Sequence, residues 1–176
     1  MLYTGKGDDG TTKTFSCDQR ISKSSIIAEA LGALDELNSF LGICKSKSKD
    51  YQKVIHQVQE DLFIIQAELA GSDMTIEMNK VRKMESEINK MEKELPEITK
   101  FFIPGGSELG AIFDFGRTIT RRAERRVIAV AEEGKIEIGD GTKAYLNRLS
   151  SLLYVLARLS NHFSGIKEES PDYIIR

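Results

Sequence analysis

Apolar residues recur every three or four positions along most of the chain after residue 23, which is the period of an amphipathic helix. The first helix is expected to begin at Ser24 or Ser25, since either hydroxyl can cap it. A second begins after the polar link at 45–50 and is expected to end at Gly71. The stripe of the first helix comprises Ile27, Ala30, Leu31, Leu34, Asn38 and Leu41, and that of the second Val54, Val58, Leu62, Ile65 and Leu69.

Three further segments share this period. The third ends at Pro96 and carries charges at its other positions, so it is expected on the outside of a bundle. A long fourth helix is predicted from Gly105-Gly-Ser107 to about Glu133, and a fifth follows the Gly-rich turn at 134–141. This turn could instead hold a small hairpin. The third stripe comprises Val81, Met84, Ile88, Met91 and Leu95, and the fifth Tyr145, Leu149, Leu152, Leu156, Leu159 and Phe163.

Five amphipathic helices with short links predict an all-α fold, a five-helix antiparallel bundle in a single domain over residues 1–176. Residues 24–165 form the bundle in this prediction. Residues 1–23 are rich in Gly, Thr, Ser and Asp and have the period of neither helix nor strand, so they are predicted to be an irregular loop. The tail at 166–176 is expected to be an arm. No strand is predicted.

Charge and cysteine usage limit the class of protein. The net charge of −2 supplies no basic field for nucleic acid or an anionic membrane, so neither is an expected partner. The two cysteines make no disulfide framework and show no zinc-binding spacing. The N-terminus lacks an apolar signal core, and no apolar run is long enough for a membrane span. We expect a soluble, cytoplasmic protein.

The clearest chemical signal is the run from Arg117 to Arg126, which reads Arg-Thr-Ile-Thr-Arg-Arg-Ala-Glu-Arg-Arg. On a helical wheel, one strip comprises Arg117, Arg121, Glu124 and Arg125, whereas Arg122 and Arg126 lie on the opposite flank of the apolar stripe. Because guanidinium groups donate to two phosphate oxygens at once, this arginine strip predicts a polyphosphate site. The alternatives are a solvated face with salt bridges and a nucleic-acid helix, and the low net charge argues against the second.

The loop Tyr3–Thr12 has three glycines, four hydroxyl-bearing side chains and one lysine. Glycines let backbone N–H groups approach an anion, and Asp8 or Asp9 could hold Mg²⁺ through water. The spacing is not that of a Walker A loop. A flexible chain start is the alternative. Lys23 is a further candidate phosphate ligand. The candidate ligands in the loop are Thr4, Gly5, Lys6, Gly7, Asp9, Gly10, Thr11 and Thr12.

Polar residues also occur on or beside core faces. Asp35 lies at the edge of the first stripe, and Arg117 is its candidate partner. The polar side of the fifth helix is predicted to carry Asn147, Tyr154, Arg158 and Asn161, of which Asn147 lies nearest the helix start. No Ser/His/Asp or Cys/His arrangement for a protein nucleophile is visible.

Five segments, taken together and in order, resemble the PduO-type ATP:cob(I)alamin adenosyltransferases. They are Tyr3–Thr12, Ala28–Ser39, Phe102–Ser107, Arg117–Arg126 and Tyr145–Ser150. In one departure from the family's loop, Gly5 and Lys6 replace a basic residue and a threonine, which leaves the exact contacts of this loop open.

The resemblance implies a homotrimer with active sites between subunits, in which the N-terminal loop wraps the triphosphate of MgATP. It implies a pair across the subunit boundary between Asp35 and Arg117. It places Phe101, or its neighbour Phe102, against the lower face of the corrin. It makes Arg121 and Glu124 the expected catalytic residues. The expected nucleotide ligands outside the loop are Lys23, Arg121, Arg122, Glu124, Arg125 and Asn147.

The implied reaction transfers the 5′-deoxyadenosyl group of ATP to the cobalt(I) of cob(I)alamin, giving adenosylcobalamin and triphosphate. Because Co(I) is itself the nucleophile, no catalytic serine, cysteine or histidine is needed. A corrinoid reductase is a candidate partner. Two alternatives remain at the level of sequence: an ATP- or polyphosphate-binding sensor, and a structural bundle whose arginines form only salt bridges.

Overall fold

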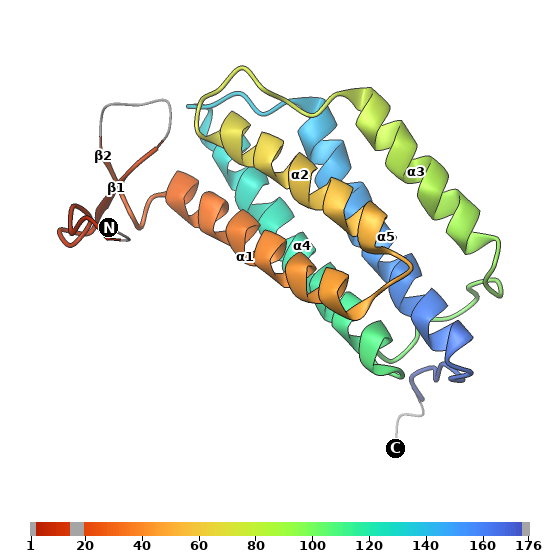
Figure 1. Cartoon of the computed structure of the whole chain (residues 1–176). Coiled ribbons are helices and arrows are strands. Elements are labelled where there is room, and N and C mark those ends of the chain that lie inside the picture. The colour runs from red at the N-terminus through yellow and green to blue at the C-terminus, as the bar shows by residue number, and fades with distance from the viewer. Residues whose placement is uncertain (1–2, 15–19, 174–176) are drawn as a thin grey trace.

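A computed structural model describes residues 3–14 and 20–173 of the chain. Figure 1 shows an antiparallel helical bundle with a small hairpin beside it. Sequential helices run in opposite directions, as predicted for an antiparallel bundle. The helices are α1 (Ile26–Lys47), α2 (Gln52–Leu69), α3 (Met78–Glu92), α4 (Glu108–Glu133) and α5 (Asp140–Phe163).

Capping residues set the ends of the two helices that carry most of the predicted site. The Ser25 side chain accepts a hydrogen bond from the Ala28 N–H at the start of α1. Ser107 does the same for the Gly110 N–H at the start of α4. Gly134 ends α4 at a φ of 73°, a left-handed conformation that favours glycine. These ends confirm the start of the first helix and both predicted limits of the fourth.

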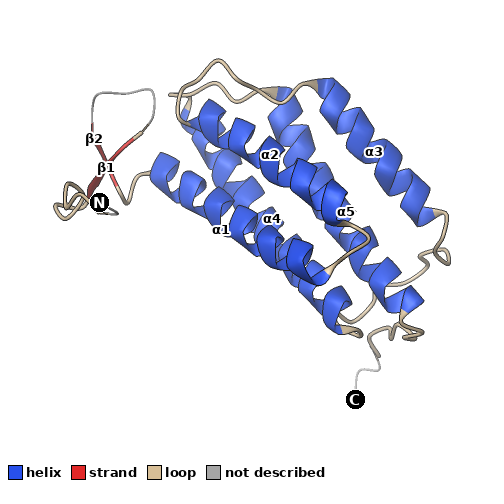
Figure 2. Ribbon diagram, viewed as in Figure 1, coloured by secondary structure: helices blue, strands red, loops and turns tan. Residues whose placement is uncertain are grey.

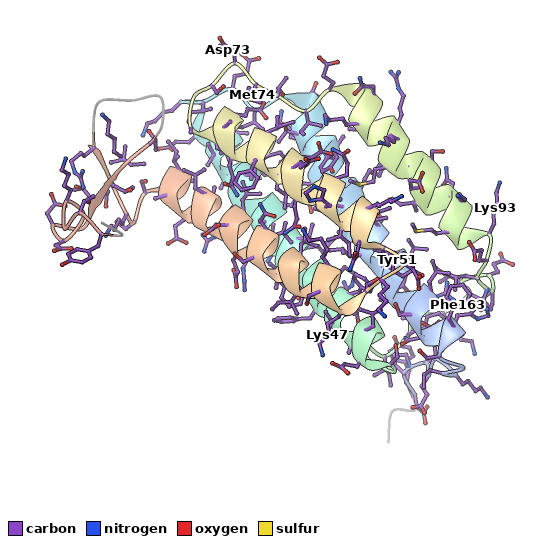
Figure 3. All side chains as sticks on the ribbon, viewed as in Figure 1. Lys47, Tyr51, Asp73, Met74, Lys93 and Phe163 are labelled. Carbon is purple, nitrogen blue, oxygen red and sulfur yellow. The ribbon has the colours of Figure 1, made fainter. Side chains whose placement is uncertain are left out.

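Helix α5 lies in the middle of the bundle, where it packs against α4 and α3, while α1 packs against α4 and α2 (Figure 2). Helix α3 lies at the edge of the bundle and packs mainly against α5, which confirms its predicted outer position. The predicted stripe of α5 is buried from Tyr145 to Leu159. Phe163 was wrongly assigned to this face. It is 65% exposed because it is the last residue of the helix (Figure 3).

Two residues expected on a polar side of α5 are instead buried. Arg158 and Asn161 are only 3% and 6% exposed. The segment before α4 and the chain after α5 cover this side of the helix, and both form hydrogen bonds with these two side chains. Residues 166–169 of the predicted C-terminal arm are therefore held against the bundle by hydrogen bonds.

The N-terminal region contains the one sheet found among the described residues. Strand β1 (Thr11–Lys13) pairs antiparallel with β2 (Arg20–Ser22), with Thr12 opposite Ile21. The prediction of no strand was wrong here, because strands of three residues are too short to show an alternating pattern. The Gly-rich segment after α4 is a turn without a hairpin, as expected. No described helix is both long and apolar enough to cross a membrane.

Candidate functional site

A cavity of about 630 Å³ lies between the loop that precedes α4, helix α4 itself and helix α5. It brings both phenylalanines of the predicted corrin site beside two arginines of the arginine strip. Its lining comprises Ile98, Thr99, Lys100, Phe101, Phe102, Pro104, Asp114, Arg117, Arg121, Ser150, Ser151 and Tyr154. We call residues 98–104 the aromatic loop. These residues come together because α4 begins soon after the aromatic loop and α5 packs against α4.

The two phenylalanines of the aromatic loop have different surroundings. Phe101 is 80% exposed. Phe102 is half-buried, and the guanidinium carbon of Arg158 lies 5.0 Å from the centre of its ring. Phe102 is thus already in contact with the bundle through a cation–π interaction. Phe101 is the aromatic side chain that remains free to contact a ligand.

The arginine strip divides into a paired and an unpaired part. Arg117 donates from Nε to Oδ1 of Asp114 at 2.6 Å, and Asp114 is buried. Arg121 and Arg125 are exposed and form no hydrogen bond or ion pair with any residue that the structure describes. Sequence reasoning missed Asp114, although its position three residues before Arg117 is a signal for such a pair. The unpaired guanidinium groups are available to an anion.

Arg122 and Arg126 lie on the opposite flank of α4, as the helical wheel predicted. Arg122 forms an ion pair with Glu36 on α1. Arg126 lies 3.6 Å from Glu29 on the same helix. Both pairs are about half exposed. Within one chain these arginines therefore link α4 to α1, and the role of Arg122 at the nucleotide stays a prediction.

Glu124 and Asn147 meet between α4 and α5. The Asn147 side-chain amide donates to Oε1 of Glu124 at 3.1 Å. Arg148 donates in turn to the amide oxygen of Asn147 at 2.6 Å, and its Nε donates to Glu85 on α3 at 2.8 Å. The structure thus joins two predicted nucleotide ligands through a hydrogen bond and orients them with a third side chain that sequence reasoning missed.

Asp35 and Arg117 do not form a pair within one chain. Asp35 is exposed on α1 and forms no hydrogen bond or ion pair with the described residues, while Arg117 is paired with Asp114. The predicted contact between them across a subunit boundary stays a prediction. Asn38, by contrast, is buried as expected, and it exchanges hydrogen bonds with Gln59 across the contact between α1 and α2.

The N-terminal loop is a compact turn held by two basic side chains. Lys23 donates from Nζ to the carbonyl oxygen of Gly7 at 2.7 Å. Arg20, which sequence reasoning missed, donates to the Thr11 hydroxyl at 2.5 Å and to the carbonyl oxygen of Lys6. Gly5 and Gly10 have φ values of 66° and 78°, which explains the glycines at these turns.

Asp9 is the acidic group of this loop with the most defined surroundings. Its Oδ1 accepts hydrogen bonds from the Thr11 N–H at 2.9 Å and from the Thr11 hydroxyl at 2.7 Å. These hydrogen bonds hold the pKa of the Asp9 carboxyl below its usual value. The described residues contain no cluster of three or more His, Cys, Asp or Glu side chains that could hold a metal ion. A divalent ion therefore finds no protein cage in the described part of the chain.

The N-terminal loop and the arginine strip are separate in one chain. No hydrogen bond or ion pair joins Lys23 or the loop to Arg121, Glu124 or Asn147 among the described residues. Another cavity, of about 640 Å³, lies between the hairpin, α1 and α2, and Thr12 and Lys23 line it. Figure 1 shows the hairpin and the aromatic loop at opposite ends of the bundle. One chain thus presents two groups of predicted ligands that do not meet.

Comparison with known proteins gives consistent results over nearly the whole chain. The sequence profile of the family described as "Cobalamin adenosyltransferase" matches residues 2–160. A corrinoid adenosyltransferase of Bacillus subtilis is 37% identical over 175 residues, which cover 94% of this chain and 89% of that protein. The corrinoid adenosyltransferase PduO of Citrobacter freundii is 36% identical over 170 residues, or 92% of this chain and 50% of that protein. This chain thus matches about half the length of that second relative.

Solved structures give the same result at the level of the fold. A variant of the PduO-type ATP:corrinoid adenosyltransferase of Lactobacillus reuteri, complexed with cobalamin and ATP, superposes with a TM-score of 0.90 at 26% identity. The match covers 97% of this chain and 99% of that one. Another variant of that protein, complexed with ATP, gives a TM-score of 0.86 at 27% identity over 97% and 100% of the two chains. The chain belongs to the cobalamin adenosyltransferase family.

Proposed function

We propose that this protein transfers the 5′-deoxyadenosyl group of ATP to the cobalt(I) of a corrinoid, forming adenosylcobalamin and releasing triphosphate. The observation that carries the proposal is the cavity in which exposed Phe101 lies beside the unpaired guanidinium of Arg121. An aromatic surface suits the flat, largely apolar corrin ring, and a free guanidinium suits the triphosphate. The match to the corrinoid adenosyltransferase of Bacillus subtilis, over 94% of this chain and 89% of that protein, supports the same reaction.

The reaction balances without a nucleophile from the protein. The electron pair of Co(I) attacks the C5′ carbon of ATP and forms the cobalt–carbon bond. The bond between C5′ and its oxygen breaks, and the oxygen leaves with the triphosphate. Cobalt ends formally as Co(III). The protein must hold the two substrates in line and stabilise the charge that develops on the leaving group.

The arginine strip supplies the groups for this second task. Arg121 faces the same cavity as Phe101, so it is placed to donate to the leaving triphosphate near the acceptor. Arg125 lies one helical turn further along α4 and continues the line of positive charge. Glu124, held by Asn147 at 3.1 Å, is oriented to accept a hydrogen bond from a ribose hydroxyl. In this proposal Arg121 and Glu124 are the catalytic residues.

The proposed active site is completed by a second copy of the chain in a homotrimer. The separation of the N-terminal loop from the arginine strip supports this, because a loop from a neighbouring subunit can cover the triphosphate. Asp35 is exposed on α1 and has no partner among the described residues of its own chain, so it is free to reach Arg117 of a neighbouring subunit. Sedimentation tests the assembly. Asp35→Asn is expected to weaken the trimer or its activity, and unchanged sedimentation together with unchanged kinetics contradicts this contact.

Magnesium enters the proposal as a partner of ATP. The described residues offer no cluster of acidic ligands, and Oδ1 of Asp9 already accepts two hydrogen bonds. This donor set suits an ion that is held mainly by phosphate oxygens and water, with Asp8 or Asp9 reached through a water molecule. The ion supplies charge neutralisation on the triphosphate. The backbone N–H groups of the N-terminal loop and the Lys23 side chain then orient the triphosphate.

An anaerobic spectral assay tests the proposed reaction. Purified protein is mixed with chemically reduced cob(I)alamin and MgATP, and the Co(I) absorption band is followed. We expect the band to disappear at a rate proportional to the enzyme concentration, with one triphosphate released per cobalamin consumed. If the band persists while ATP binds normally by calorimetry, the chain is an ATP-binding protein without this activity.

A further inference from the structure

Arg158 is a buried arginine that lies directly behind the aromatic loop. Arg158 is only 3% exposed, although its guanidinium is charged at every physiological pH. Its Nε donates to Oε2 of Glu168 at 3.0 Å, and its Nη2 donates to the Pro96 carbonyl oxygen at 3.3 Å. Its guanidinium carbon lies 5.0 Å from the ring centre of Phe102. The Arg158 side chain of α5 therefore joins the C-terminal segment (166–173) to Pro96 and Phe102, which both lie in the link between α3 and α4.

Asn161, one turn along the same helix, holds the other end of this link. Its amide nitrogen donates to the Gly105 carbonyl oxygen at 2.9 Å and to Oε1 of Glu168 at 3.4 Å. Its amide oxygen accepts hydrogen bonds from the N–H and the hydroxyl of Ser107, both at 2.9 Å. A Cβ at Gly110 would lie 2.2 Å from that oxygen, so the glycine leaves room for the Asn161 side chain.

The C-terminal segment completes the arrangement through its main chain. The Ile103 N–H in the aromatic loop donates to the Glu169 carbonyl oxygen at 2.8 Å. The Ile166 N–H donates to the Asn161 carbonyl oxygen at 2.9 Å, which fixes where the segment leaves α5. Figure 1 shows the segment beside the start of α4, at the end of the bundle that carries the aromatic loop. The loop is thus fixed from behind by residues at least 50 positions later in the chain.

The ion pair between Arg158 and Glu168 joins two largely buried charges. The side chains are 4% and 17% exposed, so water screens the charges little. Loss of one partner would leave the other charge buried without compensation. Nη1 of Arg158 is buried with no hydrogen-bond partner among the described residues, and Glu168 is the described carboxylate with which the guanidinium pairs. Glu168 thus balances the buried charge of the side chain that contacts Pro96 and the Phe102 ring.

We propose that Arg158, Glu168 and Asn161 are positioning residues for the corrinoid. Together they hold the aromatic loop so that Phe102 is retained against α5 and Phe101 stays free at the cavity. In this way the C-terminal segment belongs to the active site without contacting the reacting atoms. This inference rests on the proposed function, because it assigns the aromatic loop to the corrinoid and the arginine strip to ATP.

Two neighbouring glutamates provide a matched test. Glu168→Gln removes the charge that pairs with Arg158. Glu169→Gln makes the same chemical change at an exposed residue that contributes its main-chain carbonyl to the described contact. We expect Glu168→Gln to raise the KM for cob(I)alamin on the order of tenfold, below the hundredfold that a misplacement of about 1 Å can cause. The KM for ATP is expected to stay within about twofold, since the arginine strip does not move.

Rescue and a second variant keep the test decisive. Glu168→Asp retains the charge and should recover part of the corrinoid KM. If Glu168→Gln does not fold, Arg158→Lys serves in its place, because lysine keeps the charge but loses the planar contact with Phe102. Equal kinetics for Glu168→Gln and Glu169→Gln would overturn the proposal. An equal rise in both KM values would do so too, since it would indicate general loosening of the fold.

Hydrogen exchange separates this inference from the proposed function. The amides of residues 98–103 should exchange faster in Glu168→Gln than in the wild-type protein, while those of Glu169→Gln should not change. The exchange measurement does not require the protein to be catalytically active. If the wild-type protein fails to adenosylate cob(I)alamin but the exchange pattern holds, the proposed reaction is wrong and the positioning contact stands. If the exchange pattern fails in an active enzyme, the positioning contact is wrong.

Discussion

Replacing Arg121 with alanine separates binding chemistry from folding, because this side chain has no partner to lose among the described residues of its own chain. It is exposed on α4 and forms no hydrogen bond or ion pair with the described residues. Its removal leaves no buried group unpaired, so the free energy of unfolding should change by at most about 0.5 kcal/mol. Sedimentation of the variant should match that of the wild type.

The expected loss in activity is much larger. In the proposed reaction Arg121 donates to a triphosphate whose charge grows as the carbon–oxygen bond breaks. Removal of one such donor typically lowers kcat by about 10²- to 10³-fold, or about 2.7–4 kcal/mol of transition-state stabilisation. Arg121→Lys keeps the charge but not the planar pair of donors, so an intermediate loss is expected.

The assay is the rate of Co(I) loss at saturating MgATP, with Arg126→Ala as the control on the same helix. Arg126 lies 3.6 Å from Glu29, and both side chains are about half exposed, so this exposed pair contributes about 0–1 kcal/mol. Arg126→Ala should therefore keep its turnover. Normal kcat for Arg121→Ala at saturating ATP would refute the role of this residue. Equal losses of kcat in Arg121→Ala and Arg126→Ala would refute the assignment of the arginine strip to the triphosphate.

Three further predictions test the bundle that carries the site. Burial raises the pKa of the Tyr145 phenol, so the stability contributed by the neutral phenol is present below pH 10 and is lost as the pH rises further, by up to about 1.4 kcal/mol per pH unit. Tyr145→Phe removes the hydrogen bond to Asp61, so denaturant titrations should show a free energy of unfolding lower by about 1.5–3 kcal/mol at pH 7. The same variant should show a smaller decline in stability above pH 10 than the wild-type protein. Burial raises the pKa of the Cys44 thiol to about 12, so mass spectrometry should find its peptide unalkylated at pH 8 until denaturant is added, and rapid native alkylation would contradict this burial. Gly110→Ala should lower stability by about 1–3 kcal/mol, since its Cβ would displace Asn161, whereas calorimetry of Gly42→Ala on α1, where the added methyl meets ordinary contacts, should show no loss.

The helices could be predicted because each has a long apolar period and recognisable ends. Ser25, Ser107 and Gly134 mark ends that the structure confirms. The strands at Thr11–Lys13 and Arg20–Ser22 could not, because pairing across a short connection leaves no periodic pattern in three residues. Local sequence therefore determines the bundle, while the hairpin depends on contacts between its two strands.

Part of the candidate site follows from helical geometry alone. The wheel separates Arg121 and Arg125 from Arg122, and the structure places Arg122 against Glu36 on the opposite flank. Arg158 could not be placed in the same way. Its partners lie in segments without a period, and only the tertiary fold brings them together.

The relation between the N-terminal loop and the arginine strip depends on assembly. No described hydrogen bond or ion pair within one chain connects Lys23 with Arg121 or Glu124. The sequence contains both groups, yet neither the wheel nor the fold of one subunit brings them into contact. The family resemblance supplied the expectation that a second subunit does so, and sedimentation with the variants above is its test.

Formation of the cobalt–carbon bond is the direct chemical consequence of the proposed reaction. ATP labelled with ¹³C at C5′ is incubated anaerobically with the protein and cob(I)alamin, and the corrinoid is isolated in the dark and examined by mass spectrometry and NMR. The label is expected in a light-sensitive adenosylcobalamin, bonded to cobalt, in a one-to-one ratio with released triphosphate. Recovery of all the label in ATP, ADP or free adenosine, with unalkylated cobalamin, would contradict the proposed reaction.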